Sequence, residues 1–379
     1  MRGALPFDRA TYRHLFRRAF ADHPSPRRRR ILRVARVTIP LLFAINTVCL
    51  WLDHLLYPGF RRLRIRRPLF IVGHARSGTT LMHSLATLDR EHMSWFATFE
   101  LFLPSIVQRK FLGAVARLDR WLGAPLARRI RTFEDRVFAR SRDLHPVGLT
   151  RPEEDEFLLL LGCTSPSLAM LFPYQSDLTR LARFDELPAG YRHRVLGAYR
   201  ELVRRQLYLR GPEKHHLSKN PTFSGKMRTL LEIFPDARFI VMERHPEEAI
   251  PSLLKLMARN WRMTDCDRAT IRRELRELAE LSFHTYTETL EIADSLPPGR
   301  AAVVDYRELV ANPVAVFEKV WPELGYDFTP EFRARLEEAG RRERGFESRH
   351  RYQLEEFDLD REEIRRRLAP LYDRFGWER

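Results

Sequence analysis

The chain has 379 residues, of which 66 are basic and 50 acidic, and its formal net charge is +16 at neutral pH. A hydrophobic content of 44% supports a sizeable core and excludes a disordered chain. The excess charge is concentrated in residues 1–67, with 16 arginines and three aspartates, whereas residues 68–379 contain 50 basic and 47 acidic residues, which argues against a nucleic-acid-binding protein.

The most apolar segment, residues 37–60, lies within the basic N-terminal part. Pro40, Asn46 and Asp53 interrupt it, so its uninterrupted portion is shorter than the roughly 20 residues of a spanning helix. Arginines flank it on both sides, which disagrees with the charge asymmetry of a single span. Three interpretations stay open: a helix docked on the protein's own body, an interfacial helix attracted to anionic lipid, and a true span.

From residue 68 onward, short apolar runs alternate with helical patterns. Three runs predict buried strands: 68–73, 237–244 and 301–306. Helices are expected after Gly78, through much of 95–145, over 188–211, from Pro246 and over 267–294. Residues 151–162 resemble a helix N-terminus, because acids precede an apolar run, and 339–351 is predicted to be a loop. The alternation predicts an α/β domain over 68–379, a parallel sheet flanked by helices, preceded by a helical extension over 1–67.

The strongest motif joins the first predicted strand to its helix. Gly73 and Gly78 have the spacing of a phosphate-binding loop, which aims backbone N–H groups at an anion. Further donors lie in and next to the turn: Arg76, Ser77, Thr79 and Thr80. A nucleotide triphosphatase would have lysine where Thr79 stands, which argues against ATP or GTP as the ligand. An ordinary strand-to-helix turn is the alternative.

The segment A-R-S-G-T-T-L at residues 75–81 resembles the loop of sulfotransferases that use 3′-phosphoadenosine 5′-phosphosulfate (PAPS). Ala75 replaces the proline of that family's loop, which changes turn rigidity but removes no phosphate donor. The resemblance implies a P-loop-like α/β core in which Arg76 to Thr80 bind the 5′-phosphate.

Two further segments are similar to the same family. Arg244 ends a predicted strand and Ser252 follows eight positions later, the spacing at which the resemblance implies binding of the 3′-phosphate. Lys219, one of only six lysines, stands in S-K-N-P, similar to the K-D-P or K-S-P of tyrosylprotein sulfotransferases. There the resemblance implies that the lysine stabilises the departing phosphate oxygen. Arginines at strand ends are common, and a surface lysine is the alternative for Lys219.

A general base is expected soon after the first helix, because the resemblance implies a glutamate or a histidine that takes the acceptor proton. Glu100 is favoured over His92 and His83, since its apolar neighbours would raise the pKa of its carboxyl. A solvated helix glutamate is the alternative. The acids at 153–156 also resemble a family feature, and we interpret them as helix-start or acceptor-site structure.

The C-terminal segment 347–359 resembles the family's H-x-Y-S-L-E-E-F-G pattern, with Asp358 in place of the glycine. The resemblance makes Arg349 and Arg351 candidates for closing over the 3′-phosphate. Three widely separated cysteines, Cys49, Cys163 and Cys266, indicate neither a disulfide framework nor a metal site, and no metal is expected.

The sequence therefore predicts a sulfotransferase that moves the sulfuryl group of PAPS to the hydroxyl of a small-molecule or lipid-like acceptor. The expected location is cytoplasmic, with an anionic membrane surface at the inner face as a candidate partner and no nucleic acid. Two alternatives are kept: a P-loop nucleotide kinase or triphosphatase, and a non-catalytic nucleotide-binding protein associated with membranes.

Overall fold

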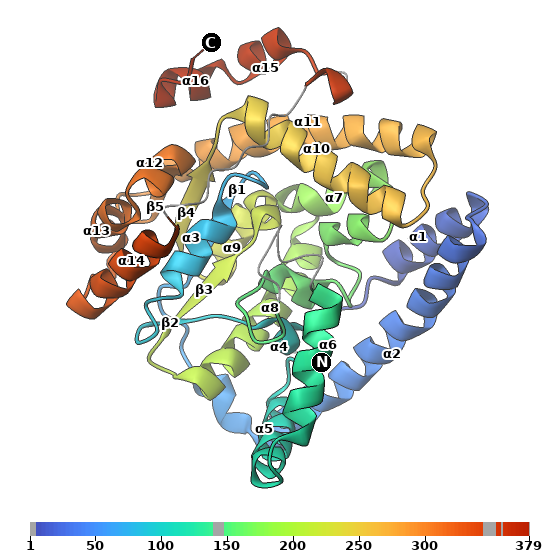
Figure 1. The fold of residues 1–379 in the computed structure, drawn as a ribbon, viewed down its shortest axis with the longest axis vertical. Helices are drawn as coiled ribbons and strands as arrows, with labels where there is room; N and C mark the ends of the chain where they lie inside the picture. The colour runs from blue at the N-terminus through green and yellow to red at the C-terminus, as the bar shows by residue number, and fades with distance from the viewer. Residues whose placement is uncertain (1–4, 139–147, 344–353, 358, 379) are drawn as a thin grey trace.

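The centre of the molecule is a parallel sheet of five strands in the order β2-β3-β1-β4-β5 (Figure 1). The computed structural model describes residues 5–138, 148–343, 354–357 and 359–378. The strands are β1 (Leu69–Gly73), β2 (Met93–Ser94), β3 (His215–Lys219), β4 (Arg238–Glu243) and β5 (Ala301–Asp305). Because β1 lies in the middle, all five of its residues are buried, which explains its unbroken apolar sequence.

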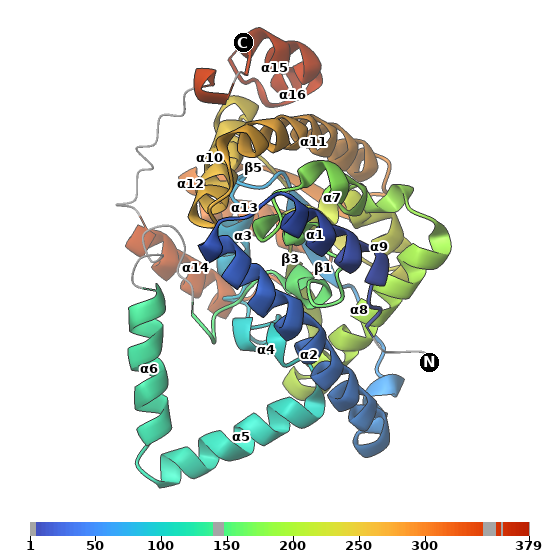
Figure 2. The same cartoon turned by 90° about the vertical axis from the view of Figure 1, so that its right-hand side faces the viewer.

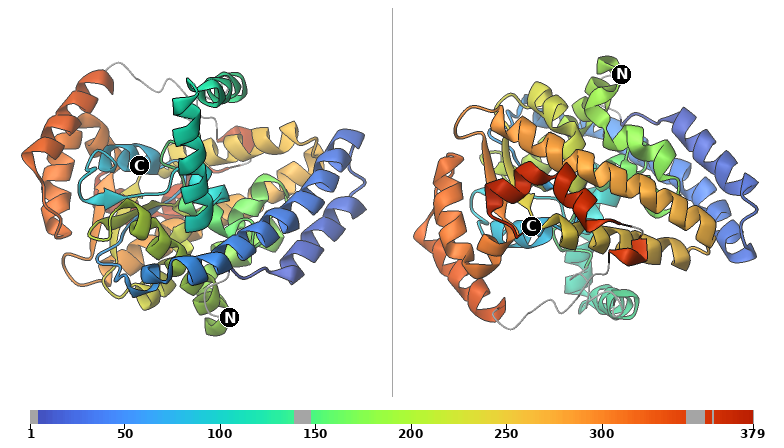
Figure 3. Two further views of the ribbon diagram at one scale, coloured as in Figure 1. Left: turned by 90° about the horizontal axis from the view of Figure 1, so that it is seen from below. Right: turned by 90° about the horizontal axis from the view of Figure 1, so that it is seen from above.

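Helices cover both faces of the sheet, and successive strand residues point to opposite cores. Phe70 and Val72 belong to the larger core, whereas Leu69 and Ile71 belong to the smaller one. The larger core includes residues of α7 (Gln175–Ala182), α8 (Ala189–Arg210), α9 (Met227–Ile233), α10 (Pro246–Met263) and α11 (Arg268–Asp294). The smaller core is formed with α3 (Thr79–Ala86), α12 (Tyr306–Ala311), α13 (Pro313–Glu323) and α14 (Pro330–Glu343). Near the C-terminus, α15 (Arg361–Arg367) and α16 (Ala369–Phe375) pack beside α10 and α11 (Figures 1 and 3).

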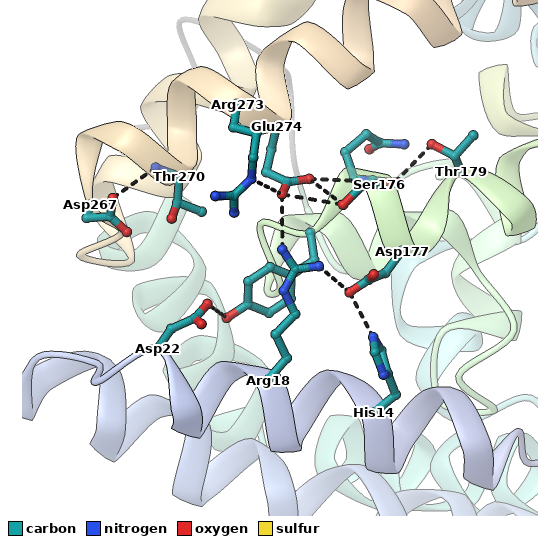
Figure 4. Close-up of polar contacts among 12 residues, drawn as sticks. His14, Arg18, Asp22, Ser176, Asp177, Thr179, Asp267, Thr270, Arg273 and Glu274 are labelled. Carbon is teal, nitrogen blue, oxygen red and sulfur yellow. Dashed lines mark hydrogen bonds and ion pairs between the residues drawn. The ribbon is translucent and has the colours of Figure 1, made fainter.

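The first helix, α1 (Arg9–Ala21), is fastened to the body by ion pairs (Figure 4). Arg18 contacts Asp177 of α7 at 2.5 Å and Glu274 of α11 at 3.3 Å. Its guanidinium also lies 4.2 Å from the ring centroid of Tyr174. One arginine therefore joins the N-terminal helix to two helices of the α/β core.

The second helix, α2 (Pro26–Leu56), runs unbroken through Pro40, so the predicted interruption of the apolar segment is wrong. Asn46 and Asp53 lie on a buried stripe of the helix instead of breaking it. Asp53 pairs with Arg205 of α8 at 2.8 Å, and both side chains are fully buried. By length and composition alone α2 could cross a membrane, but core helices of soluble proteins and signal sequences meet the same criterion.

Opposite the buried stripe, α2 exposes a second, apolar one. Its members recur every three or four residues and are Val34, Val37, Leu41, Ile45, Val48, Trp51 and Leu55. The structure thus supports docking for one face of α2 and leaves the other face open to solvent.

Two amphipathic helices, α5 (Ile106–Trp121) and α6 (Pro125–Phe138), follow the short α4 (Thr98–Phe102). In Figure 2, α5 leads away from the body and α6 returns beside it. We call residues 106–138 the arm. The expectation of helix through much of 95–145 is confirmed as far as residue 138.

The three predicted strands are confirmed, as are the helices expected at 188–211 and 267–294. The helix start expected at 151–162 is wrong, because only a single 3₁₀ turn forms there, Asp155–Leu159. The loop expected over 339–351 is wrong for residues 339–343, because α14 continues to Glu343, and the rest of that prediction lies outside the described residues.

Candidate active site

The carboxyl ends of β1, β3 and β4 meet at one edge of the sheet, where open α/β folds bind their ligands. The loop after β1 turns sharply there. Gly78 has φ +89°, and a Cβ at this position would lie 2.3 Å from the Tyr306 ring. Only glycine fits both the left-handed backbone and the close ring. The turn leads directly into the N-terminus of α3, so Thr79 and Thr80 begin the helix as expected of an anion-binding loop.

The loop arginine and the two predicted 3′-phosphate residues lie together. Arg76 has φ +75°, an uncommon left-handed conformation for a residue other than glycine. Its Nε donates to the Ser252 hydroxyl at 3.1 Å. Arg244 Nη1 donates to the Arg76 carbonyl at 3.3 Å. Residues separated by 176 positions in sequence are thereby brought into one cationic corner.

Arg244 is held in place by two contacts to its guanidinium and one to its backbone carbonyl. Its guanidinium pairs with Glu248, one turn into α10, at 2.8 Å. It also lies 4.6 Å from the ring centroid of Tyr306, which is a cation–π distance. The Tyr286 hydroxyl donates to the Arg244 carbonyl at 2.9 Å. The side chain is therefore preorganised next to the loop.

Lys219 ends β3 and faces the other side of the loop. Its Nζ lies 2.6 Å from Glu154 Oε1 and 3.5 Å from the Thr80 hydroxyl. The lysine side chain is almost completely buried, and that of Glu154 is about a quarter exposed. A lysine, a carboxylate and a loop hydroxyl thus form a compact group at the edge of the sheet.

The segment carrying Glu154 is anchored by the next two acids. Asp155 is buried and accepts hydrogen bonds from Tyr199 at 2.5 Å and from Ser218 at 2.8 Å. Glu156, also buried, accepts from Ser165 at 2.5 Å. These bonds hold the segment against β3, so Glu154 is presented to Lys219 by a rigid support.

Glu100, the predicted general base, lies in a different cluster. It is fully buried and pairs with Arg109 at 2.5 Å and with Arg210 at 2.6 Å. Its second oxygen accepts the Ala97 N–H at 2.8 Å, which closes the start of α4. Two guanidinium groups and a backbone N–H thus occupy the carboxylate of Glu100 within the described residues, and its role as the base stays a prediction.

The profile of the sulfotransferase family matches residues 68–330, which is more than half of the chain. The chain belongs to the sulfotransferase family. It is 29% identical over 269 residues to omega-hydroxy-beta-dihydromenaquinone-9 sulfotransferase Stf3 of Mycobacterium tuberculosis (strain CDC 1551 / Oshkosh) and to the protein of the same name in Mycobacterium bovis. The match covers 68% of this chain and 62% of each relative.

Solved sulfotransferases share the fold. Sulfotransferase STF9 from Mycobacterium avium superposes with a TM-score of 0.67 at 19% identity, over 99% of this chain and 98% of that one. Sulfotransferase STF1 from M. tuberculosis H37Rv gives 0.66 at 20% identity, over 89% and 86%. The family resemblance and the α/β fold class predicted from the sequence are thus confirmed.

In this member of the sulfotransferase family, Glu153 is a second carboxylate near Lys219. Burial raises the pKa of Glu153 above its ordinary value, against the pull of the Lys219 charge. Its Oε1 accepts the N–H of Glu154 at 2.9 Å. From the sequence, both residues were interpreted as helix-start or acceptor-site structure. Lys219 was chosen because lysine is rare in this chain. Its contact with Glu154 could not be predicted, because the two residues are 65 positions apart in sequence.

The two histidines weighed as bases also have other surroundings. His83 is buried, and burial together with the Lys219 charge lowers its pKa to about 3. His92 lies beside Asp89, with Nδ1 at 2.8 Å from the carboxylate. Arg349 and Arg351 fall outside the described residues. Within the part of the chain that the structure describes, no group of three or more His, Cys, Asp and Glu side chains could hold a metal ion.

Proposed function

We propose that the protein transfers the sulfuryl group of PAPS to the hydroxyl of a lipid-like alcohol. One observation carries the proposal: Arg76, Lys219 and Arg244 come from three separate segments and converge around the loop at the carboxyl edge of the sheet. Family membership indicates sulfuryl transfer, and three cations suit a donor that carries two phosphates and a sulfate. The absence of a P-loop lysine at Thr79 weighs against the kinase alternative.

The donor would be bound on one side by the loop and on the other by Arg244 and Ser252. The loop residues Arg76, Ser77, Gly78, Thr79 and Thr80 would hold the 5′-phosphate through backbone N–H groups, hydroxyls and the guanidinium. Arg244 and Ser252 would hold the 3′-phosphate. In the free chain Glu248 neutralises Arg244 at 2.8 Å, so a bound phosphate would compete with this surface carboxylate.

In the chemical step, the acceptor oxygen forms a bond to sulfur while the bond from sulfur to the bridging phosphate oxygen breaks. The electron pair of the broken bond stays on that oxygen, where Lys219 neutralises the developing charge. The proton of the acceptor hydroxyl passes to a carboxylate. We assign this role to Glu154, supported by Glu153, in place of Glu100. Glu154 lies 2.6 Å from Lys219, so acid–base and charge-stabilising groups adjoin one another.

An apolar alcohol is the proposed acceptor class. The curated relatives are named for a menaquinone derivative with a hydroxyl group, which is a lipid. In this chain the arm lies between α4 and Glu153 in sequence, and its exposed side chains include Phe111 and Trp121. We further propose a cytoplasmic protein that attaches peripherally to the inner face of the membrane, supported by the exposed apolar stripe of α2 and its flanking arginines.

The test supplies PAPS together with primary alcohols of increasing chain length. The release of 3′,5′-diphosphoadenosine is measured for each alcohol. We expect turnover to rise from ethanol to long-chain primary alcohols and to fall at least 100-fold in Lys219→Ala, on the order expected for losing charge stabilisation. A hydrophilic acceptor that outperforms every apolar one would overturn the acceptor class. Turnover with ATP in place of PAPS would overturn the reaction.

A further inference from the structure

The arm, residues 106–138, is amphipathic and presents its apolar side to solvent. The exposed members are Phe111, Leu118 and Trp121 on α5, Leu122 directly after it, and Leu126, Ile130 and Phe133 on α6. Their spacing of three, four and seven residues places those of each helix on one face. Trp121, at the end of α5, is 81% exposed. A surface tryptophan at the far end of an apolar stripe is typical of segments that enter a membrane interface.

The same arm is strongly basic. Its exposed cations are Lys110, Arg117, Arg120, Arg128, Arg129 and Arg131. Of the acids between residues 106 and 135, Asp119 is buried, where it accepts the N–H groups of Leu126 and Ala127 and so joins the two helices. Glu134 accepts the Leu149 N–H at 2.8 Å. Asp135 is exposed, so among the described side chains of the arm six exposed cations face one exposed acid, and the arm complements an anionic surface.

Both ends of the arm connect to the segment that carries the proposed catalytic carboxylates. Before the arm, Thr98 N–H donates to the Arg151 carbonyl at 3.0 Å, and Ala97 forms a bridge with Pro152. At the other end of the arm, Glu134 of α6 accepts the Leu149 N–H, as described above. Glu153 and Glu154 follow directly. A surface on which the arm rests would therefore lie next to the entrance of the site.

We propose that the arm docks on the anionic surface of a lipid bilayer and that the acceptor alcohol reaches the site from that bilayer. The second part rests on the proposed function, whereas the docking itself does not. Insertion of the apolar stripe removes it from water, and the cations flanking it contact lipid headgroups. The outward stripe of α2, which also lies between arginine clusters, adds a second contact of the same kind.

A second copy of the chain is the competing occupant. Pairing two arms along their apolar faces would bring six exposed cations of one copy against six of the other. Such like-charge contact opposes association, whereas anionic headgroups neutralise the same cations. Charge thus favours lipid over self-association.

Co-sedimentation of the full chain with vesicles tests the proposal. The vesicles are phosphatidylcholine alone or phosphatidylcholine mixed with phosphatidylglycerol. We expect binding to the mixed vesicles only, weakened at least ~10-fold in Phe111→Ser/Leu118→Ser/Trp121→Ser, because each insertion site contributes apolar burial. Arg117→Gln/Arg120→Gln/Arg128→Gln, which leaves the apolar faces intact, should weaken binding to a similar degree and reduce its dependence on salt.

The matched control is Met263→Ser/Val310→Ser, which removes exposed apolar side chains from α10 and α12 and should leave vesicle binding unchanged. Vesicle binding that persists in both arm variants, including the case in which only changes in α2 abolish it, would overturn the proposal. So would a dimer of the wild-type chain, seen by light scattering, that the apolar arm variant converts to a monomer. Binding of 3′,5′-diphosphoadenosine is measured in parallel, so loss of the proposed function is recognised separately from loss of docking.

Discussion

Replacing Glu100 by glutamine separates the two carboxylates that could serve as the base. Glu100 pairs with Arg109, whose side chain is 6% exposed, and with Arg210, whose side chain is 48% exposed. Breaking a buried pair leaves an uncompensated charge and costs ~3 kcal/mol or more, whereas a half-exposed pair contributes about 0–1 kcal/mol. Burial already lowers the pKa of Arg109 to about 10 despite the attraction of Glu100, and its hydrogen bond to Gln206 at 2.6 Å is to a neutral amide oxygen.

We therefore expect Glu100→Gln to lower the free energy of unfolding by about 3 kcal/mol, nearly all of it from the Arg109 contact. The assay is urea denaturation followed by intrinsic fluorescence, together with turnover at a temperature where the variant is folded. Turnover should stay within a few-fold of wild type at that temperature. Glu154→Gln is the comparison: it should keep its stability within about 1 kcal/mol, because Glu154 is about a quarter exposed and Glu153 remains as a second carboxylate near Lys219.

In the same comparison, Glu154→Gln should lose ~100-fold or more in kcat, which is the contribution of a general base. The reasoning is refuted if Glu100→Gln is as stable as wild type and loses turnover while Glu154→Gln retains it. That pattern would identify Glu100 as the base and would show that its two arginine contacts rearrange when acceptor binds.

Three further outcomes follow from the structure. Asp53→Asn should lower the free energy of unfolding by ~3 kcal/mol, because it leaves Arg205 buried without its charge partner. In a double-mutant cycle, the variant that carries both Asp53→Asn and Arg205→Met should lose less stability than the two single variants lose in sum. Burial raises the pKa of Glu243 well above its ordinary value of 4.5, and neither of its oxygens has a hydrogen-bond partner among the described residues. A carboxyl whose pKa is raised in the folded state contributes stability below the unfolded pKa and loses it as the pH rises, so Glu243→Gln should remove a decline in melting temperature that begins as the pH rises above the ordinary value. Gly78→Ala should weaken nucleotide binding in calorimetry at least ~10-fold, because its Cβ would meet the Tyr306 ring at 2.3 Å and its φ is +89°.

Local motifs were predictable from the sequence because their chemistry is contained in a few adjacent residues. The loop at 73–80 was expected, and Arg244, Ser252 and Lys219 were chosen by spacing or rarity. The structure brings these residues to one edge of the sheet, as a parallel α/β fold requires. Their proposed roles toward the donor still await experiment.

The carboxylates were harder to predict because their roles depend on distant partners. Glu154 belongs to a run of four acids that follows an arginine and a proline and precedes an apolar run, which locally resembles a helix start. Only the packing of Asp155 against Tyr199 and Ser218 shows that this segment is pinned to β3. β3 was not predicted as a strand because it contains the polar residues His216 and Ser218. Both side chains contact the buried Asp155, which explains why polar residues occur in a buried strand.

The helix α2 shows the same limit. From the sequence, Asn46 and Asp53 were counted as interruptions of an apolar segment, whereas in the helix they form a buried polar stripe. Their partners explain the stripe: Asn46 donates to the Phe102 carbonyl at 3.0 Å, and Asp53 pairs with Arg205. A sequence cannot reveal a partner 152 positions away, so docking and exposure of opposite faces had to come from the structure.

The central claim, that the cationic corner binds a nucleotide carrying a 3′-phosphate for sulfuryl transfer, is tested most directly by titration calorimetry of the full chain. The ligands are 3′,5′-diphosphoadenosine and ATP, each added to wild type and to Arg244→Ala. We predict that 3′,5′-diphosphoadenosine binds wild type at least ~10-fold more tightly than ATP, a difference of about 1.4 kcal/mol, and that Arg244→Ala removes the preference. Tighter binding of ATP, or binding of neither nucleotide, would contradict the claim.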